Sequence, residues 1–360
     1  MNGSVREVEL VELAELAELA AADYPLLLNA LLQGEDLSRE QMLALMRAIM
    51  SGLLTPAQIA GVLAALRAKG ESVTEIAAAA EVMRALSTRV MLGDIPNLVD
   101  TCGTGGDGAH TFNISTAAAF VAAAAGVSVA KHGGRSVSST CGSADVLEAM
   151  GVNVQLQPEQ VARCVRQIGI GFMFAPNHHS AMKHAAPVRR ELGVRTLFNL
   201  LGPLTNPAGA RHQVIGVYSP HLPLRLAQAL QRLGSERVLV VHGAGGLDEL
   251  SLSGENQVAE LKDGVVTEYT VSPEQFGLTH AALAELQVED LAAARAMFTA
   301  ALCGDFRAAS DIVALNAGAA IYVAGLAATL TEGVARAQEE IQSGRAWEKL
   351  QQLIECSHHV

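Results

Sequence analysis

The stretch DTCGTGGDGAHTFNIST, residues 100–116, decides the fold, because an apolar strand candidate runs directly into a glycine-rich loop. Residues 103–108 read G-x-G-x-x-G, which is the spacing of a dinucleotide-binding turn. That turn needs a helix that starts within the glycines and an acidic residue about 20 positions later. Here the helix start comes only at Ser115-Thr116, and the next strand ends in the cationic KHGGR, residues 131–135. No G-K-[ST] closes the loop, so a Walker loop is excluded too. We therefore predict a loop that binds an anion.

The residues around the loop are suited to phosphate. Its glycines can turn backbone N–H groups toward one point without obstruction from side chains. Asn113, Ser115 and Thr116 add donors at a helix N-terminus, where the helix dipole favours an anion. The next strand end adds cations and hydroxyls, namely Lys131, Arg135, Ser136, Ser138, Ser139 and Ser143. Two such clusters in successive crossovers indicate a ligand with more than one phosphate.

Composition narrows the class of protein. The chain has 360 residues, 50% of them hydrophobic, and a mean hydropathy of +0.27, so it can bury a large core and its length suggests two domains. A net charge of -12 argues against a nucleic-acid-binding protein and against a protein held on an anionic membrane.

Cysteine usage and the N-terminus indicate a cytoplasmic protein. The five cysteines are odd in number and show no C-x-x-C spacing, so neither a disulfide framework nor a zinc site is expected. Acidic residues at positions 7, 9 and 12 stand where a signal peptide needs basic ones, and no apolar run has the length of a membrane span.

The order of predicted elements gives an α/β fold with a small all-helical N-terminal domain, residues 1–95, and a larger α/β domain, residues 96–360. Capping boxes at Ser38/Gln41 and Thr55/Gln58 start helices in the first domain, and later helical segments are allowed to join it. Strands are predicted at 98–102, 127–130, 152–155, 172–174, 214–218 and 238–241, with helices at 116–125, 146–150, 158–168 and 222–233. Such alternation predicts a mostly parallel central sheet. Residues 288–355 return to helix, with close helix packing expected near Asn316.

Two further clusters carry charge. Asp248 and Glu249 follow another strand and glycine turn, and such a pair can hold magnesium beside a diphosphate. Residues 176–207 hold three histidines, a lysine and three arginines within PNHHSAMKHAAPVRRELGVRTLFNLLGPLTNP. An arginine there suits bidentate capture of a carboxylate. No G-x-S-x-G elbow exists and Cys102 has no identifiable base, so no catalytic nucleophile is assigned.

Five motifs in this order resemble those of the anthranilate phosphoribosyltransferases: GTGGDGAHTFNIST, KHGGRSVSS, GSADVLEAMG, the 176–207 block and GGLDELS. The resemblance runs from about residue 33 to at least residue 254. It implies a fold of the nucleoside-phosphorylase/phosphoribosyltransferase class II type and a homodimer formed through the helical domain. It also implies transfer of the phosphoribosyl group of 5-phosphoribosyl 1-diphosphate (PRPP) to anthranilate, with release of diphosphate, the second step of tryptophan biosynthesis from chorismate.

The resemblance implies the site residues as well. Those for PRPP are Gly103, Gly106, Asp107, Thr111, Asn113, Ile114, Ser115, Thr116, Lys131, His132, Gly133, Gly134, Arg135, Ser139 and Ser143. Those for anthranilate are Gly103, Gly134, Arg189, His132 and His179, and those for two Mg2+ ions are Ser115, Asp248 and Glu249. One position departs from the family, which usually reads KHGNR: Gly134 replaces the asparagine, so weaker or altered anthranilate binding is expected.

Two alternatives remain at this point. A pyrimidine nucleoside phosphorylase would share the implied fold, but its KHSTGG-type segment is absent here. A non-catalytic nucleic-acid-binding paralogue would keep the fold, but the net charge of -12 and the retained Asp107, Ser115, Asp248 and Glu249 count against it.

Overall fold

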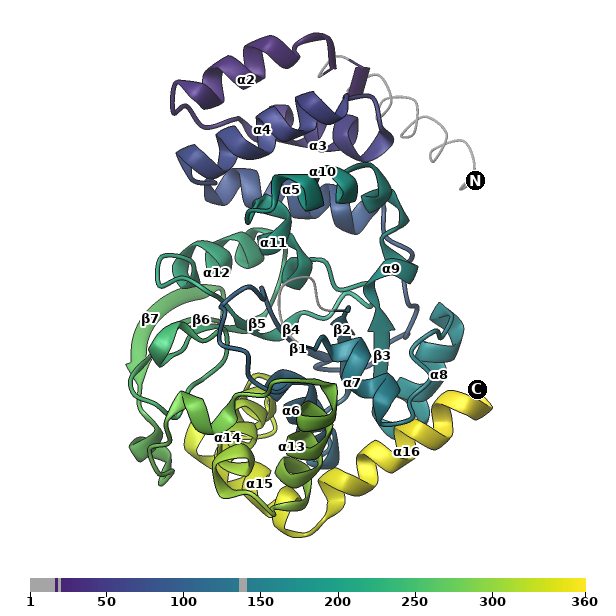
Figure 1. The fold of residues 1–360 in the computed structure, drawn as a ribbon, viewed down its shortest axis with the longest axis vertical. Coiled ribbons are helices and arrows are strands. Elements are labelled where there is room, and N and C mark those ends of the chain that lie inside the picture. Colours follow the sequence, from purple (N-terminus) through teal and green to yellow (C-terminus); the bar gives the residue numbers. More distant parts are fainter. Residues whose placement is uncertain (1–16, 19–20, 136–140) are drawn as a thin grey trace. The chain divides into compact units, whose positions relative to one another are not determined.

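The structure is a computed structural model that describes residues 17–18, 21–135 and 141–360 (Figure 1). These residues form two compact units. The helical unit comprises the described residues up to Ser87 together with His179–Thr205, and the sheet unit comprises the described residues of Thr88–His178 and Asn206–Val360. Most of the leucine-rich stretch at residues 12–20 lies outside the described residues.

The helical unit begins with α2 (Tyr24–Leu32), α3 (Arg39–Ser51), α4 (Pro56–Lys69) and α5 (Val73–Ala85). The predicted capping boxes are confirmed: Ser38 and Thr55 each accept the N–H of the glutamine three residues later, at 3.2 and 3.3 Å. The segment from the predicted cationic block adds η1 (Ser180–His184), α10 (Ala186–Leu192), α11 (Leu197–Leu201) and η2 (Gly202–Leu204). It joins the helical unit because α10 packs against α4, and α11 against α4 and α5.

The sheet unit is built on a seven-stranded sheet with the order β3-β2-β1-β4-β5-β6-β7. Its parallel strands are β1 (Val99–Gly103), β2 (Val129–Gly133), β3 (Ile170–Phe174), β4 (His212–Gly216) and β5 (Arg237–His242). Two antiparallel strands, β6 (Asn256–Lys262) and β7 (Val265–Val271), extend one edge. The mostly parallel sheet predicted from sequence is confirmed.

Helices flank this sheet. Those that follow parallel strands are α6 (Ile114–Ala124), α7 (Ser143–Ala149), α8 (Pro158–Ile168), α9 (Ala175–His178) and α12 (Pro223–Arg232). The C-terminal part adds α13 (Leu291–Cys303), α14 (Arg307–Val323), α15 (Leu330–Gln342) and α16 (Arg345–His359), with short turns η3 (Ala244–Gly246), η4 (Pro273–Phe276) and η5 (Leu283–Leu286) before it. Helix α12 packs against β5, β6 and β7, whereas α6 and α14 pack against β1 from the other side (Figure 1).

The strand predictions contain one error and one omission. Residues 152–155, predicted as a strand, form an irregular segment, because their backbone pairs with the C-terminal helix instead of a neighbouring strand: Asn153 N–H donates to the Ser357 hydroxyl at 3.0 Å. The β6–β7 hairpin was not predicted. Its signal is Asp263-Gly264, whose positive φ angles of 51° and 75° suit a tight hairpin turn.

Glycine lies at the carboxyl ends of four of the five parallel strands. β1, β2 and β4 end at Gly103, Gly133 and Gly216, and Gly243 follows β5. Gly103 and Gly216 are direct partners in the β1–β4 register. Carboxyl ends of parallel strands form the usual ligand edge of such a sheet, so the predicted site residues are concentrated there.

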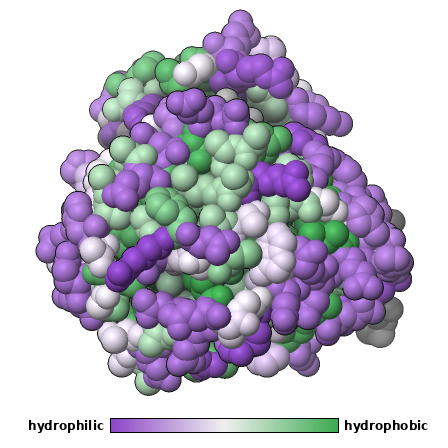
Figure 2. All heavy atoms as spheres, turned by 60° about the horizontal axis from the view of Figure 1, so that its bottom comes forward, coloured by the Kyte–Doolittle hydropathy of each residue, from purple (hydrophilic) through white to green (hydrophobic). Residues whose placement is uncertain are grey.

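The surface is mixed in character. Figure 2 shows a face on which hydrophobic residues are interspersed among hydrophilic ones. Among the described residues, no helix has both the length and the apolar composition needed to cross a membrane.

Candidate functional site

The loop after β1 has the open backbone that the glycine pattern predicts. Gly105, Gly106 and Gly108 have φ angles of 66°, 75° and 72°. This left-handed region favours glycine, because a residue with a Cβ is strained there. The loop continues to α6, and the N–H of Val288 donates to the carbonyl of His110 at 2.9 Å, which ties its far end to the segment before α13. The loop is thus held at both ends while its glycine amides stay at the strand edge.

The acidic pair Asp248-Glu249 lies directly against the glycine ends of three strands. A Cβ built on Gly216 would stand 1.5 Å from the Asp248 carbonyl oxygen, and one on Gly103 would stand 2.3 Å from Asp248 Oδ2. A Cβ on Gly243 would stand 2.2 Å from the Glu249 carbonyl oxygen. These glycines are required for close approach of the backbone, a role that the sequence motif did not reveal.

The carboxylates of the pair reach the predicted anion-binding amides. Gly105 N–H donates to Asp248 Oδ2 at 2.7 Å, and Ser115 N–H, in the first turn of α6, donates to Glu249 Oε1 at 3.1 Å. Asp107 joins them, since its Oδ2 accepts the Asp248 N–H at 3.3 Å. The glycine loop, the α6 N-terminus and the acidic pair therefore form one cluster.

Lys131 completes this cluster from β2. The side chain is buried, and its ammonium donates to the Thr101 carbonyl and, at 3.3 Å, to the Ser115 hydroxyl. Both acceptors are uncharged, so neither contact neutralises the lysine. Because Ser115 also bonds Glu249, Lys131 and the acidic pair meet at one residue.

Beneath Lys131 lies a buried polar pair that the sequence reasoning missed. Asp100, fully buried in β1, accepts the His132 N–H at 3.1 Å and the Asn206 amide at 2.7 Å. Asn206 also donates to the Ala130 carbonyl at 2.9 Å. Burial raises the pKa of Asp100, and the charge of Lys131 opposes that rise. The pair fixes the β2 end that carries Lys131 and His132.

The acidic cluster fits a divalent cation. Burial, followed by repulsion from Asp107 and Glu249, raises the pKa of Asp248 well above its usual range. Burial raises the pKa of Glu249 to about 7, although Lys131 and Ser115 oppose the rise. A bound cation would stabilise the ionised carboxylates and so offset the free-energy cost of burying their charge. No three His, Cys, Asp or Glu side chains of the described ranges gather as a complete metal site, so further ligands would come from substrate and water, as magnesium prefers.

Other predicted PRPP residues lie near the same loop with differing exposure. Asn113 donates its amide to the Cys141 carbonyl at 3.0 Å, while its own Oδ1 is buried and has no hydrogen-bond partner among the residues that the structure describes. Thr111 forms a bridge with Gln287. Ile114 and Thr116 are buried in the sheet unit, each 1% exposed.

The loop after β2 is described only in part. Ser143 donates its hydroxyl to the Gly134 carbonyl at 3.3 Å, next to Gly133. Arg135 is exposed and pairs with Asp145 and Glu148 at 2.8 and 2.9 Å, so its charge is directed to α7. Ser139 lies outside the described residues, as do Ser136 and Ser138.

Arg189 and His179 belong to the helical unit. Arg189, in α10, is half-buried and stacks over the Phe198 ring at 5.3 Å. Burial lowers its pKa. A guanidinium that rests on an aromatic ring is suited to a planar carboxylate. His179 is buried.

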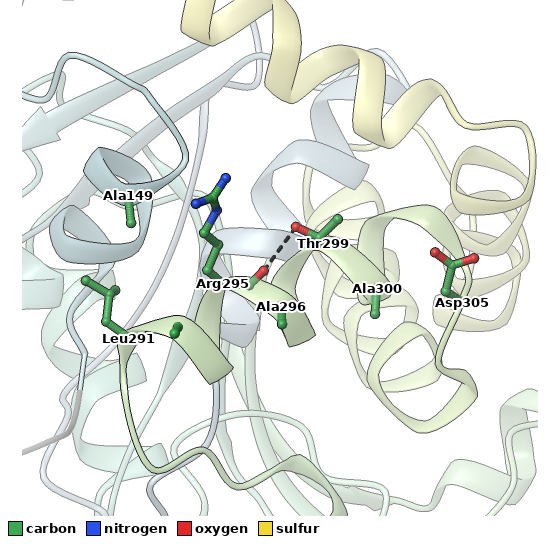
Figure 3. A pocket seen from close by; sticks show the side chains of 8 residues that line it. Ala149, Leu291, Arg295, Ala296, Thr299, Ala300 and Asp305 are labelled. Carbon is green, nitrogen blue, oxygen red and sulfur yellow. Dashed lines mark hydrogen bonds between the residues drawn. The ribbon is translucent and has the colours of Figure 1, made fainter.

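A surface depression of about 700 Å³ lies apart from these residues, between α7 and α13 (Figure 3). Half of its eight lining residues are alanines, and Arg295 and Asp305 are among the others. It contains none of the predicted site residues.

The family comparisons agree with this architecture. Residues 95–347 match the family described as "Glycosyl transferase family, a/b domain", and residues 25–87 match its "helical bundle domain". A protein of Chromobacterium violaceum named anthranilate phosphoribosyltransferase is 59% identical over 92% of this chain and 97% of its own length. A protein of the same name from Thiobacillus denitrificans is 61% identical over 92% of this chain and 96% of its own.

Solved structures give the same result. The anthranilate phosphoribosyltransferase of Thermus thermophilus superposes with a TM-score of 0.87 at 47% identity, covering 92% of this chain and 99% of that one. The enzyme of Saccharomyces cerevisiae, solved in complex with PRPP and Mg, superposes with a TM-score of 0.79 at 28% identity, covering 89% and 93%. The similarity therefore extends over both units, and it favours the transferase over the phosphorylase and the non-catalytic paralogue.

Proposed function

We propose how this chain, which belongs to the anthranilate phosphoribosyltransferase family, binds its substrates. Its sheet unit holds PRPP at the cluster around Ser115, and anthranilate attacks the ribose there. The observation that carries this proposal is the meeting of three features at Ser115: the α6 N-terminus, the Lys131 ammonium and the Glu249 carboxylate. A single bound polyanion explains the positive Lys131, and the cations bound to that polyanion explain the negative Glu249 at the same place.

The difficult step is the departure of diphosphate. The anthranilate nitrogen forms a bond to ribose C1, the bond from C1 to the diphosphate oxygen breaks with its electron pair, and the nitrogen then loses a proton to water. Charge develops on the leaving oxygens, where preorganised donors are most effective. Lys131 and the amides of residues 103–108 are our assignments for that role. Because both belong to strand ends fixed by the sheet, little reorganisation is needed.

Ser115, Asp248 and Glu249 are our assignments for magnesium, and we propose two ions. Bound magnesium supplies positive charge to the diphosphate oxygens. In the structure the two carboxylates accept Gly105 and Ser115 N–H groups, so they already lie beside the amides proposed to face phosphate. This adjacency supports a shared site for cation and phosphate.

Anthranilate needs orientation more than a base. Its aromatic amine is neutral at pH 7, so it can attack without prior proton removal, and correct placement beside C1 supplies the rate enhancement. We assign Arg189 to the substrate carboxylate, with His132, His179, Gly103 and Gly134 in contact with the ring or amine. The absence of a nucleophile motif in the sequence agrees with this chemistry.

Anthranilate fluorescence tests the function directly. Adding PRPP to the protein with anthranilate should decrease the fluorescence when Mg2+ is present and leave it unchanged when a chelator removes the metal. A parallel assay with thymidine and phosphate should give no free base. Phosphorolysis of thymidine, combined with steady anthranilate fluorescence, would assign the chain to the phosphorylases instead.

We also propose a homodimer that forms through the helical domain, residues 1–95 with segment 179–205. Apolar side chains on its described helices support this, since Leu26 and Leu32 are 71% and 68% exposed in the single chain. Light scattering during size-exclusion chromatography should give twice the chain mass of 37.6 kDa. The five free thiols support our prediction of a cytoplasmic location.

A further inference from the structure

Asn316 is a buried polar residue in the middle of α14, and its neighbours in the helix are apolar. It is 2% exposed, and Leu315, Ala317, Gly318 and Ala319 beside it are also buried. Burying a side-chain amide costs free energy unless its groups are hydrogen-bonded. Helix packing alone would be served by alanine or leucine, so the asparagine needs another explanation.

The amide of Asn316 pairs with both backbone groups of Leu250. Its Oδ1 accepts the Leu250 N–H at 2.9 Å, and its Nδ2 donates to the Leu250 carbonyl at 2.9 Å. The same nitrogen donates to the Ile312 carbonyl, one turn earlier in α14, at 2.9 Å. Both N–H groups of the amide are therefore used, and the side chain has one fixed orientation relative to its helix.

Leu250 directly follows the acidic pair and is itself 1% exposed. On the strand side, Gly103, Gly216 and Gly243 allow the backbone of residues 248–249 to approach closely. On the helix side, Asn316 fixes the position and direction of the next peptide groups. The pair is thus held by close backbone approach on the strand side, by Asp107, which accepts the Asp248 N–H at 3.3 Å, and by Asn316 on the helix side.

We propose that Asn316 is a positioning residue, which sets the Asp248 and Glu249 carboxylates through the backbone of Leu250 so that they can hold a divalent cation. This rests on the proposed function, in which the pair takes magnesium beside PRPP. Some residues orient metal ligands without contacting the metal, and removing them changes metal affinity by about 10- to 100-fold. We expect the lower part of that range, because Asn316 acts through one backbone residue.

The test measures Mn2+ binding in the presence of PRPP and without anthranilate, by electron paramagnetic resonance of free Mn2+. Asn316→Ala leaves both Leu250 backbone groups unpaired and should weaken Mn2+ binding by about 10-fold. It should raise the Mg2+ concentration for half-maximal turnover by a similar factor, while KM for anthranilate changes less than two-fold.

Two further variants separate positioning from folding. In Asn316→Ser the shorter hydroxyl can bond Ile312 within the helix but does not reach Leu250, so it should weaken Mn2+ binding as alanine does; it carries the test if Asn316→Ala does not fold. Leu315→Ala removes buried apolar contact from the same helix, and it should lower the melting temperature yet leave Mn2+ affinity unchanged.

The outcomes distinguish this inference from the function on which it rests. If D248N/E249Q abolishes Mn2+ binding and Asn316→Ala and Asn316→Ser bind Mn2+ as the wild type does, the positioning role is wrong and the metal site stands. Equal losses in Leu315→Ala and Asn316→Ser would also overturn it, because loosening of α14 would then suffice. If D248N/E249Q retains Mn2+ affinity, the proposed metal site itself is wrong.

Discussion

Arg189 offers the sharpest single-residue prediction, because its half-buried guanidinium stacks on Phe198 and is assigned to a carboxylate. Arg189→Ala should raise KM for anthranilate by roughly 10- to 100-fold, since a hydrogen-bonded charge pair contributes about 1.5–3 kcal/mol. KM for PRPP should change much less. Steady-state kinetics with each substrate varied in turn measures both constants.

Arg190 is the matched control for that experiment, because it follows Arg189 in α10 and is exposed. Arg190→Ala removes the same charge from the same helix and should leave both Michaelis constants near the wild-type values. Equal rises of the two constants in Arg189→Ala would contradict its assignment to anthranilate.

Gly134 gives a prediction in the opposite direction. Among the described residues, a Cβ built there would meet only Ala175 Cβ, at 3.9 Å, and the backbone is not left-handed, so these residues leave room for a side chain. Gly134→Asn should lower KM for anthranilate by about 3- to 10-fold, the effect of one added hydrogen bond. Gly134→Ala adds the Cβ without the amide and should not. An unchanged or higher KM in the asparagine variant would show that the missing polar contact has been replaced elsewhere.

Single residues also show where sequence reasoning ends. Lys131, Ser115 and the acidic pair could be predicted because each stands in a strand-end motif. Asp100 and Asn206 could not, because their hydrogen bond joins positions 106 residues apart and only the folded chain brings them together. Asn316 was attributed to helix packing for the same reason: its partner Leu250 lies 66 residues away.

At the scale of elements, the strand ends explain why glycine recurs at the site. Gly216→Ala should displace residues 248–249, because the new Cβ would stand 1.5 Å from the Asp248 carbonyl oxygen. We expect lower thermal stability and loss of Mg2+-dependent turnover. Melting curves and a Mg2+ titration of activity measure the two effects.

The control for Gly216 is Gly202, where a built Cβ would have no atom within 4 Å from the described residues other than its neighbours in the chain, and where φ is not left-handed. Gly202→Ala should match the wild type in both measurements. Should Gly216→Ala show the wild-type Mg2+ requirement, the close approach of β4 to the acidic pair would be unimportant for the site.

Sequence periodicity predicted the parallel strands well and the remaining extended segments poorly. Val152 and Val154 are buried while Asn153 and Gln155 between and after them are more exposed, so the alternation of a strand is present. Its hydrogen-bond partner, however, is α16, which no local pattern reveals. The hairpin β6–β7 was missed although Asp263-Gly264 marks its turn and β7, VVTEYTV, is rich in β-branched residues; most of β7 is exposed, so it shows no buried face.

At the scale of the whole molecule, a long insertion separates the parts of one site. The chain leaves the sheet unit after His178, adds η1, α10, α11 and η2 to the helical unit, and returns at Asn206. The glycine loop and the acidic pair therefore lie on opposite sides of this insertion in sequence and still meet within the sheet unit. Sheet topology, with β4 placed beside β1, explains that meeting.

The central claim is that Lys131 and the acidic pair serve one bound PRPP molecule, and calorimetric titration of PRPP tests it most directly. The wild type should bind PRPP with Mg2+ and bind it much more weakly without. Lys131→Met and D248N/E249Q should each weaken binding in Mg2+ by at least about 10-fold, as expected when a charge-assisted contact is lost. Wild-type affinity in either variant would contradict the account, because the cation and the carboxylates would then not share the ligand.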